Sequence, residues 1–382
     1  MNNKRKPKWV PDNAGEEFAT SMLKGKLSKN DMLKKEKGSI KANSEHQKRK
    51  KLNLDDYING VLSKDRTILA RAITLMESNS QKHISMAQNF LKGILPETGN
   101  SIRIGVTGAP GSGKSTFIET LGCYLCQRDH KLAVLAVDPS SSLSKGSVLG
   151  DKTRMEKLAR EENCFIRPSP TGGVLGGINR KTRETMLACE AAGYDIIMIE
   201  TVGVGQNEIA VRSLVDFFLL LKIPGAGDEL QSIKKGIMEL ADAIIINKSD
   251  GDNVSKAKLA KAEFSRSLHY LKSTTPDWNP KVVTASSLYN MGIAEIWDMI
   301  MDFKEITQKN GFFQKRRNQQ MKDWIHFIIR EYLETKFYDN KAVRRNLSEI
   351  EQQVIEGKLP PTTAAQKLIS KFESNVKESK DN

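Results

Sequence analysis

Three segments of the sequence combine residue types that bind phosphates, magnesium and a purine base. The first, Gly108 to Ser115, reads GAPGSGKS and follows a β-branched run. Its glycines let the backbone curl so that N–H groups point at a β-phosphate, Lys114 reaches the β- and γ-phosphates, and Ser115 is the expected magnesium ligand. The pattern predicts a P-loop. The residues expected to hold the phosphates are Gly108, Ala109, Pro110, Gly111, Ser112, Gly113, Lys114, Ser115 and Thr116.

The second segment, Asn247 to Asp250, reads NKSD and directly follows the apolar run AIII. That position is the carboxyl end of a predicted strand, where open α/β sheets bind ligands. Asp250 can accept hydrogen bonds from both the N1–H and the 2-amino group of guanine, a pair that adenine lacks. With Asn247 and Lys248 beside it, this carboxylate predicts selectivity for GTP over ATP. A backbone N–H after the final predicted strand can contact guanine O6, and the residues there are Ser286, Ser287 and Leu288.

The third segment, Glu200 to Gln206, supplies the acidic group that a magnesium site needs. Glu200 ends the run DIIMIE and takes the Walker B position, Gly203 can give an N–H to the γ-phosphate, and Gln206 can position water. Asp138 ends LAVLAVD, and Asp151 lies in the Gly- and Ser-rich stretch behind it. Each either contacts magnesium, orients water or only caps a helix start. The expected catalytic residues are Lys114, Asp138, Asp151, Glu200 and Gln206, and the expected metal ligands are Ser115, Asp138, Asp151 and Glu200.

Short β-branched runs that alternate with helical stretches must position these three segments. The runs are apolar at consecutive positions, which is typical of strands covered on both faces. Their order predicts an α/β fold of the P-loop NTPase type, with a mostly parallel sheet flanked by helices. The predicted strands are Ile102 to Thr107, Leu132 to Val137, Asp195 to Glu200, Phe217 to Leu221, Ala243 to Asn247 and Lys281 to Thr284.

Helical periodicity flanks the predicted sheet on both sides. From Leu54 onward the apolar spacing predicts two helices separated by a break at Ser63 to Asp65, and then a third from Met86 to Leu95. Beyond residue 310 two or three helices have no strand partner, so their apolar face must be buried on the domain or on another subunit. The predicted regions are a basic segment (1–52), a helical region (53–97), a P-loop GTPase domain (98–309) and a helical arm (310–382).

The positive charge of the chain gathers near its N-terminus. The 382 residues have a formal net charge of +14, and residues 1–53 hold 15 Lys and Arg against 6 Asp and Glu, a difference of +9. We expect this polar, aperiodic segment to be largely disordered or ordered by a partner. Basic tracts are more often solvated tails than nucleic-acid sites. Without a recognition helix or an aromatic-studded sheet, the sequence does not favour nucleic-acid binding.

Several other classes of protein find little support. No apolar run approaches the roughly 20 residues that span a bilayer, and the basic N-terminus lacks an apolar signal-peptide core. The four cysteines agree with a reducing compartment, and we expect a cytoplasmic protein. Cys123 and Cys126 form a C-x-x-C, which fits two small residues on one helix face better than a metal or redox pair. The five histidines are dispersed, and neither a Ser-His-Asp set nor a transition-metal site is evident.

Longer stretches of the sequence resemble the MeaB/MMAA/ArgK family of P-loop GTPases. The resemblance runs from about Leu54 to the C-terminus, on VDPSSSLSKGSVLGDKTRM, RPSPTGGVLGGINRKTRETM, ETVGVGQNE and KIPGAGDELQSIKKGIMELAD. It implies a G-protein chaperone that gates adenosylcobalamin loading into methylmalonyl-CoA mutase and protects that mutase. It also implies that Asp138 and Asp151 belong to a first switch, Glu200 to Gln206 to a second, and Pro224 to Lys234 to a third that senses the partner. The C-terminal helices would then mediate homodimerisation.

Two alternatives to this chaperone hypothesis come from other classes of protein. Some relatives carry an older description as a kinase or ATPase tied to arginine and ornithine transport, and Asn247 to Asp250 argues against an ATPase. A metallochaperone GTPase of the hydrogenase and urease maturation group usually carries His- or Cys-rich tracts, which this sequence lacks. We therefore expect a magnesium-dependent enzyme that hydrolyses GTP to GDP and serves methylmalonyl-CoA mutase or a related acyl-CoA mutase.

Overall fold

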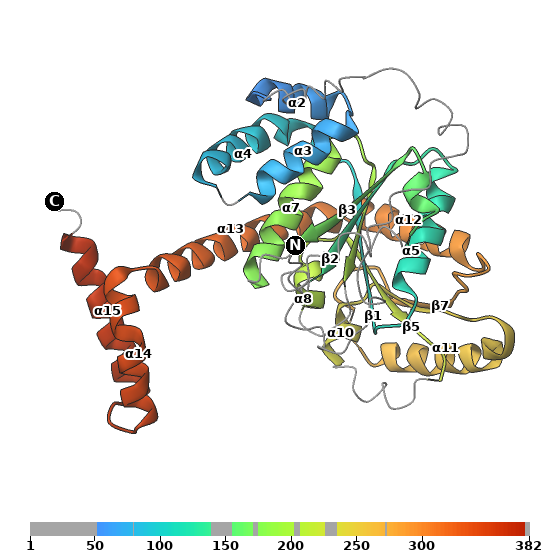
Figure 1. Cartoon of the computed structure of the whole chain (residues 1–382). Coiled ribbons are helices and arrows are strands. Elements are labelled where there is room, and N and C mark those ends of the chain that lie inside the picture. Colours follow the sequence, from blue (N-terminus) through green and yellow to red (C-terminus); the bar gives the residue numbers. More distant parts are fainter. Residues whose placement is uncertain are drawn as a thin grey trace, which may run out of the picture. The chain divides into compact units, whose positions relative to one another are not determined.

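A seven-stranded sheet organises the described part of the chain, and all its neighbouring strands run parallel (Figure 1). The computed structural model describes residues 52–78, 80–138, 155–170, 175–201, 207–225, 235–271 and 273–378. The strand order is β3-β2-β4-β1-β5-β6-β7. The strands are β1 (Ile102–Gly108), β2 (Leu132–Asp138), β3 (Cys164–Pro170), β4 (Ile196–Thr201), β5 (Phe217–Lys222), β6 (Ala243–Ile246) and β7 (Lys281–Thr284). The predicted α/β class with a parallel sheet is confirmed.

Strand β3 is the one described strand that the sequence pattern did not predict. Its segment, CFIRPSP, contains Pro168 and Pro170, which cannot donate backbone hydrogen bonds and so argue against a strand. In the structure β3 lies at one end of the strand order and pairs only with β2. Prolines are tolerated on such an edge strand, because one side of it needs no ladder hydrogen bonds.

Three helices precede the sheet, as the apolar spacing predicted. They are α2 (Leu54–Leu62), α3 (Arg66–Glu77) and α4 (Gln81–Ile94), followed by the short η2 (Leu95–Glu97). The predicted break between the first two is real, because Lys64 adopts a left-handed backbone conformation with a φ of 67° and Asp65 caps α3. Asn53 and Asp56 form a reciprocal capping box at the start of α2.

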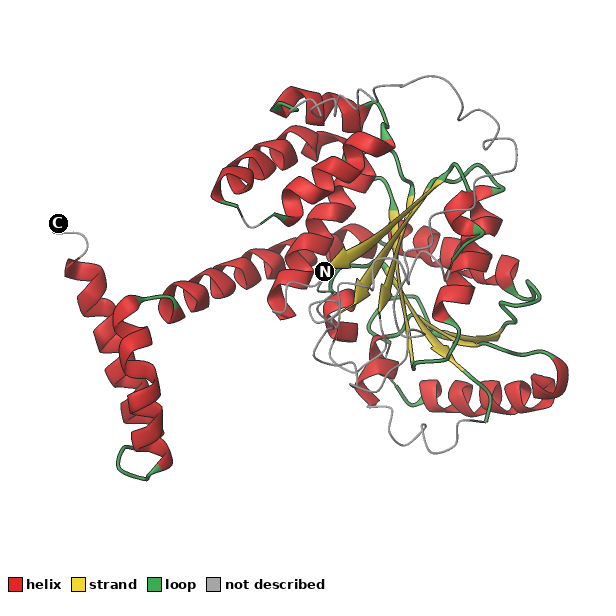
Figure 2. Ribbon diagram, in the orientation of Figure 1, coloured by secondary structure: helices red, strands yellow, loops and turns green. Residues whose placement is uncertain are grey.

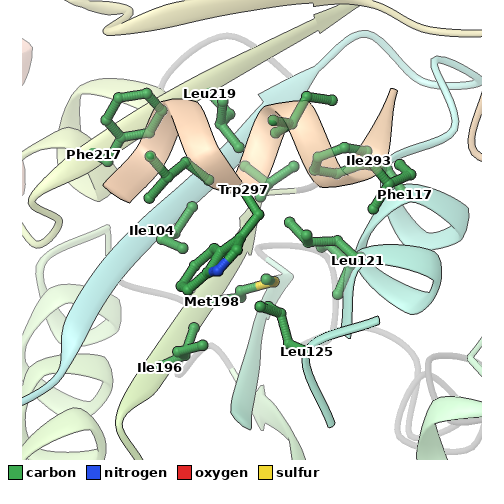
Figure 3. Packing of buried hydrophobic residues seen from close by; sticks show 14 of the residues in the cluster. Ile104, Phe117, Leu121, Leu125, Ile196, Met198, Phe217, Leu219, Ile293 and Trp297 are labelled. Carbon is green, nitrogen blue, oxygen red and sulfur yellow. The ribbon is translucent and has the colours of Figure 1, made fainter. Parts of the chain in front are cut away.

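Two helices cover one face of the sheet. Helix α5 (Lys114–Cys126) follows β1 directly, and α12 (Ile293–Lys309) follows β7. Figure 3 shows the indole of Trp297 from α12 lying among Ile104 and Met198 of the sheet, with Leu121 of α5 beside them. Because these side chains are buried together, the helix that begins at the predicted P-loop is held firmly against the strands on which the site depends.

Other helices cover the opposite face (Figure 2). In β4, Ile196 and Met198 belong to the cluster under α5, whereas Ile197 and Ile199 pack with α2, α3, α4 and α7 (Leu175–Ala191). Helix α11 (Val254–His269) covers β5, β6 and β7 in a third cluster. The remaining short helices of the described chain are α8 (Asn207–Arg212), α10 (Lys235–Leu240), η5 (Gly251–Asn253) and, packed on the α5 side, η4 (Leu158–Arg160). The sheet is therefore buried on both faces, as consecutive apolar positions predicted.

Three helices close the described chain: α13 (Phe312–Tyr338), α14 (Lys341–Ile355) and α15 (Pro361–Glu378). Helices α14 and α15 pack as a hairpin with a small apolar core of their own that includes Val343 and Ile350. Among the described helices, none combines the length and the apolar character that a bilayer span needs. The predicted N-terminal segment, residues 1–52, lies outside the described residues except for Leu52.

Candidate nucleotide-binding site

The Gly108 to Ser115 segment forms the turn between β1 and α5. Gly113 precedes the helix with a φ of 89°, and Gly108 has a φ of 153° at the end of the strand. A Cβ added to Gly113 would lie 2.6 Å from Nδ2 of Asn247, and one added to Gly108 would lie 2.5 Å from the carbonyl oxygen of Leu221. Glycine is required at both positions, because a side chain at Gly113 would collide with the amide of Asn247 and one at Gly108 with the backbone of β5.

Lys114 is the first residue of α5, and its side chain folds back over the loop. Its Nζ donates hydrogen bonds to the carbonyl oxygens of Gly108, at 2.8 Å, and Ala109, at 3.1 Å. Only 8% of the residue is exposed. The ammonium group is therefore fixed above the curled backbone, where the positive end of the α5 dipole also favours an anion.

Glu200 lies beside the start of α5 because of the strand register. Position 200 of β4 pairs with Val106 of β1, and the Oγ of Ser115 donates a 2.8 Å hydrogen bond to Oε1 of Glu200. A hydroxyl and a carboxylate at this distance are the hard oxygen donors that magnesium prefers, with nucleotide phosphates and water completing its shell. These two residues therefore fit the predicted magnesium site. Thr201, next in β4, ties the two strands together through a 2.9 Å hydrogen bond to Thr107.

Asn247 connects the predicted base site to the predicted phosphate site. Its side chain is almost fully buried, its Nδ2 donates to the carbonyl oxygen of Ser112 at 2.9 Å, and its Oδ1 accepts from the N–H and the hydroxyl of Ser287. Strands β1 and β6 are separated only by β5, so their ends lie about 10 Å apart. A nucleotide with its phosphates at one strand end and its base at the other spans that distance.

Asp250 lies beside the loop that follows β7. Its Oδ2 accepts a short hydrogen bond from the hydroxyl of Ser286, which is fully buried. The loop is closed by an isolated bridge between Ser286 and Met291, while Leu288 stays largely exposed. Lys248, which adopts a left-handed φ of 58°, is exposed at the same end of the sheet. The carboxylate of Asp250 is therefore held in place while its other oxygen can face a ligand.

Several predicted residues cannot be placed in the same way. Asp151, Gly203 and Gln206 lie outside the described residues, and only the backbone of Asp138 is described, at the end of β2. Since β2 neighbours β4, that position shares the carboxyl edge of the sheet with Glu200. The assignment of these four residues stays a prediction.

Sequence reasoning missed two contacts that connect the parts of the site. One is the hydrogen bond from Asn247 to the P-loop carbonyl of Ser112, and the other is a 2.7 Å hydrogen bond from the Oγ1 of Thr120 to the carbonyl oxygen of Ser287. Both join residues more than 130 positions apart. A local pattern carries no signal for such pairs, because they depend on the strand order. The C-x-x-C lies on α5, where Cys123 is partly buried and Cys126 is buried, as expected for two small residues of one helix.

Residues 69–342 match a family model described as methylmalonyl-CoA mutase-associated GTPase MeaB. Among named relatives, the chain is 49% identical over 321 residues to a putative GTPase of Caulobacter vibrioides, an alignment that covers 84% of this chain and 98% of the relative. It is 46% identical over 304 residues to GTPase ArgK of Escherichia coli, covering 80% of this chain and 92% of the relative.

A mitochondrial protein and a solved structure are also similar to this chain. The mouse protein named methylmalonic aciduria type A homolog, mitochondrial, is 44% identical over 331 residues, which cover 84% of this chain and 80% of that protein. A solved structure titled LAO/AO transport system kinase matches with a TM-score of 0.70 and 38% identity, covering 85% of this chain and 100% of the other. The similarity therefore extends well beyond the P-loop and the NKSD segment.

Proposed function

This chain belongs to the family of MeaB-type, methylmalonyl-CoA mutase-associated GTPases, and from that premise we propose that its GTPase cycle assists adenosylcobalamin loading and protection of a client mutase. The client is methylmalonyl-CoA mutase or a related acyl-CoA mutase. The observation that carries the proposal is the match over residues 69–342 to a family described by its association with that mutase. The geometry of the candidate site supports it, because phosphate and base positions are hydrogen-bonded into one unit through Asn247.

Hydrolysis of GTP requires a water oxygen to attack the γ-phosphorus while the bond from that phosphorus to the β–γ bridging oxygen breaks. Lys114 holds positive charge against the β- and γ-phosphates, and the N–H groups of the Gly108 to Ser115 loop hold the β-phosphate. Gln206, Asp138 or Asp151 orients the water, and Gly203 binds the γ-phosphate. Partner binding reorders these segments, which couples the mutase to turnover without new covalent chemistry.

Ser115 and Glu200 would hold magnesium, since their oxygens lie together at the P-loop. When bound, the metal ion supplies positive charge to the β- and γ-phosphate oxygens. The hydroxyl oxygen of Ser115 and the carboxylate of Glu200 would be the protein groups that hold the ion there. In this proposal Asp138 and Asp151 complete the acidic surroundings.

Asp250→Asn tests the guanine assignment. We expect the variant to bind GTP at least about tenfold more weakly, because an amide presents one acceptor and one donor where guanine offers two donors. Xanthosine triphosphate carries an oxygen in place of the 2-amino group, so its affinity should rise relative to GTP. Competition against a fluorescent GDP analogue measures both constants. An unchanged ratio of the two affinities would remove Asp250 from the base site.

The client is tested by GTP turnover with and without purified methylmalonyl-CoA mutase from the same organism. The proposal predicts faster phosphate release with the mutase and a complex on size-exclusion chromatography. Neither effect would be expected if the chain served arginine and ornithine transport as a kinase or ATPase, and in that case ATP should be the better substrate. A metallochaperone would instead show stimulation by a metalloenzyme precursor. Failure with the mutase would thus reject methylmalonyl-CoA mutase as the client and leave GTP hydrolysis standing.

The apolar face of α13 supports the proposed homodimer. Trp324 and Phe327 stack with ring centroids 5.3 Å apart, and the helix carries large apolar side chains that are at least 36% exposed. Such a contiguous face on a soluble helix indicates a partner surface. Its spacing of three and four residues suits packing against a second copy of the helix. The exposed residues are Met321, Ile325, Ile328, Ile329, Tyr332 and Leu333.

Ile325→Glu combined with Ile329→Glu should convert the proposed dimer to a monomer. Two carboxylates at the centre of an apolar contact would have to be desolvated without a partner. Light scattering gives the mass directly. Leu259→Glu on α11 is the matched control, since Leu259 is 60% exposed and lies outside residues 310–382. A wild-type chain that is monomeric at micromolar concentration, or a double variant that stays dimeric, would contradict the assignment of this face.

The proposed function also assigns a role to each region of the chain and a cellular location to the protein. We assign GTP hydrolysis to residues 98–309, dimerisation to 310–382, and the helical region 53–97 to support of the sheet face that it covers. The basic segment 1–52 is proposed to be a tail without a defined partner. All four cysteines are free, which agrees with a cytoplasmic location in a reducing compartment.

A further inference from the structure

The hydroxyl of Thr120 lies within hydrogen-bonding distance of two carbonyl oxygens from different parts of the molecule, and its single proton is shared between them. Its Oγ1 lies 2.9 Å from the carbonyl oxygen of Thr116, one turn back in α5, and 2.7 Å from the carbonyl oxygen of Ser287 in the loop after β7. The first is the ordinary contact of a helical threonine and stabilises little. The second joins the helix that begins at the P-loop to the loop expected to contact guanine.

The contact with Ser287 completes a ring of hydrogen bonds around the candidate site. Ser287 donates to Asn247, Asn247 donates to the P-loop carbonyl of Ser112, and the P-loop leads directly into α5, which carries Thr120. Asn247 fixes one side of the 286–288 loop and Thr120 fixes the other. The loop is therefore held from both sides relative to the phosphate site.

Apolar packing does little to hold the tip of the loop on the Thr120 side, whereas Ser286 and Ser287 behind it are buried. A pocket of about 250 Å³ lies between α5 and the loop, and Thr116, Thr120, Ser287 and Leu288 are among the residues that line it. Leu288 is 74% exposed, so the side chain at the tip of the loop contributes little buried apolar area. Where few apolar contacts restrain a loop, a single hydrogen bond has a large share in setting its position.

We propose that Thr120 is a positioning residue that sets the distance between the 286–288 loop and guanine O6. The proposal rests on the proposed function, in which a backbone N–H of this loop donates to O6. Thr120 touches neither the base nor the phosphates and acts through the carbonyl group of Ser287. Its effect should therefore appear in recognition of the 6-keto group and not in the chemical step.

Thr120→Val removes the hydroxyl at nearly constant volume and is the decisive variant. We expect GTP to bind about three- to tenfold more weakly, the size of one lost hydrogen bond. Inosine triphosphate, which keeps O6 and lacks the 2-amino group, should lose the same factor. The triphosphate of 2-aminopurine riboside, which lacks O6 and keeps the 2-amino group, should lose little. The turnover number at saturating GTP should stay near the wild-type value, whereas KM should rise.

Two further variants separate positioning from a general structural effect. Thr120→Ser keeps the hydroxyl and should restore GTP binding. Thr307→Val is the matched control, because the Oγ1 of Thr307 makes the same one-turn-back contact, at 2.7 Å to the carbonyl oxygen of Phe303 in α12, and its other acceptor, Lys304, also lies in α12. This control should leave the discrimination between the three nucleotides unchanged. Each affinity is measured by competition against a fluorescent GDP analogue.

The outcomes distinguish this inference from the function on which it rests. An equal loss for all three nucleotides in Thr120→Val, or full retention of the preference for O6, would overturn the role of Thr120. If the wild-type chain itself does not prefer GTP over the 2-aminopurine nucleotide, the proposed contact between the loop and O6 is wrong. That result would reject the guanine assignment independently of any effect of Thr120. A preference lost in Thr120→Val and regained in Thr120→Ser would establish the inference.

Discussion

Lys114→Ala is expected to lower the GTP turnover number by about 10²- to 10³-fold, the usual effect of removing one preorganised electrostatic group. The Nζ of this side chain is held over the P-loop, within 3.1 Å of two loop carbonyl oxygens. Little reorganisation is then needed when the β- and γ-phosphates arrive, so the loss of the ammonium charge should fall on the transition state. Phosphate release at saturating GTP and magnesium measures the effect.

The result depends on showing that the Lys114 variant is folded. Since only 8% of Lys114 is exposed, Lys114→Met serves as a second variant that keeps the aliphatic stem packed in the loop. Lys281→Ala is the control, because Lys281 lies on β7 in an exposed 3.4 Å pair with Asp302 and such pairs contribute at most about 1 kcal/mol. Both Lys114 variants should melt cooperatively, and turnover in either of them near the wild-type rate would remove Lys114 from the mechanism.

The central strands could be predicted from the sequence because each is buried on both faces. Residues 243–246, AIII, are apolar at every position, which indicates a strand covered on both faces, and the NKSD segment follows at the carboxyl end of that strand. The outer strand β3 gave no such signal, because its prolines match an edge position that only the strand order reveals. The P-loop could also be predicted, because its glycines and Lys114 lie within one short segment, Gly108 to Ser115.

The contacts that hold the site together could not be predicted. Thr120 and Ser287 are 167 positions apart, and Ser112 and Asn247 are 135 apart. Each residue alone is an ordinary polar side chain, and only the order β1-β5-β6-β7 brings the pairs together. Sequence therefore indicates which groups meet the nucleotide, while the groups that position them emerge from the fold.

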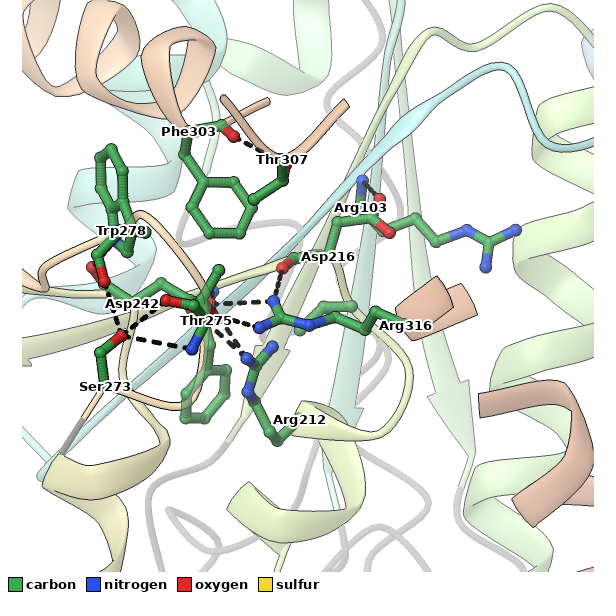
Figure 4. Close-up of polar contacts among 12 residues, drawn as sticks. Arg103, Arg212, Asp216, Asp242, Ser273, Thr275, Trp278, Phe303, Thr307 and Arg316 are labelled. Carbon is green, nitrogen blue, oxygen red and sulfur yellow. Dashed lines mark hydrogen bonds and ion pairs between the residues drawn. The ribbon is translucent and has the colours of Figure 1, made fainter. Parts of the chain in front are cut away.

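Long-range contacts also anchor α13 to the sheet, through a cluster of buried charges. Figure 4 shows Asp242 lying beside the guanidinium groups of Arg212 and Arg316, with Asp216 close by. Burial lowers the pKa of Arg316 to about 10, although Asp242 opposes that shift. Arg103 is paired with Glu190 at 2.8 Å in the same region. Burial alone would raise the pKa of the Glu190 carboxyl, but the positive charge and hydrogen bonds of Arg103 outweigh burial, and the pKa of Glu190 is lowered. The Arg316 guanidinium and the Glu190 carboxylate are therefore both charged at neutral pH.

Arg317→Met is expected to destabilise the folded protein by about 3–5 kcal/mol, because it leaves the carboxylate of Asp216 buried without its cation. The Nε and Nη2 of Arg317 donate to the two oxygens of Asp216 at 2.8 and 2.6 Å, and both side chains are at least 90% buried. The guanidinium also donates to the carbonyl oxygens of Gly99 and Ser101. Methionine keeps the aliphatic part of the arginine side chain, so the loss should come from the missing guanidinium, which leaves the carboxylate of Asp216 and the carbonyl oxygens of Gly99 and Ser101 without their donor.

Urea unfolding measures the change, with Arg344→Met as the control. Arg344 pairs with Asp339 at 3.5 Å, but both side chains are more than 60% exposed, so that variant should lose at most about 1 kcal/mol. Adding Asp216→Asn to Arg317→Met removes the orphaned charge and should recover part of the loss. If Arg317→Met is no more costly than Arg344→Met, the buried pair does not anchor α13. A large loss that Asp216→Asn relieves would mean instead that the ion pair between Arg317 and Asp216 anchors the N-terminal part of α13 to the sheet. The exposed apolar face farther along α13 is then not needed for that anchoring and is available for a partner.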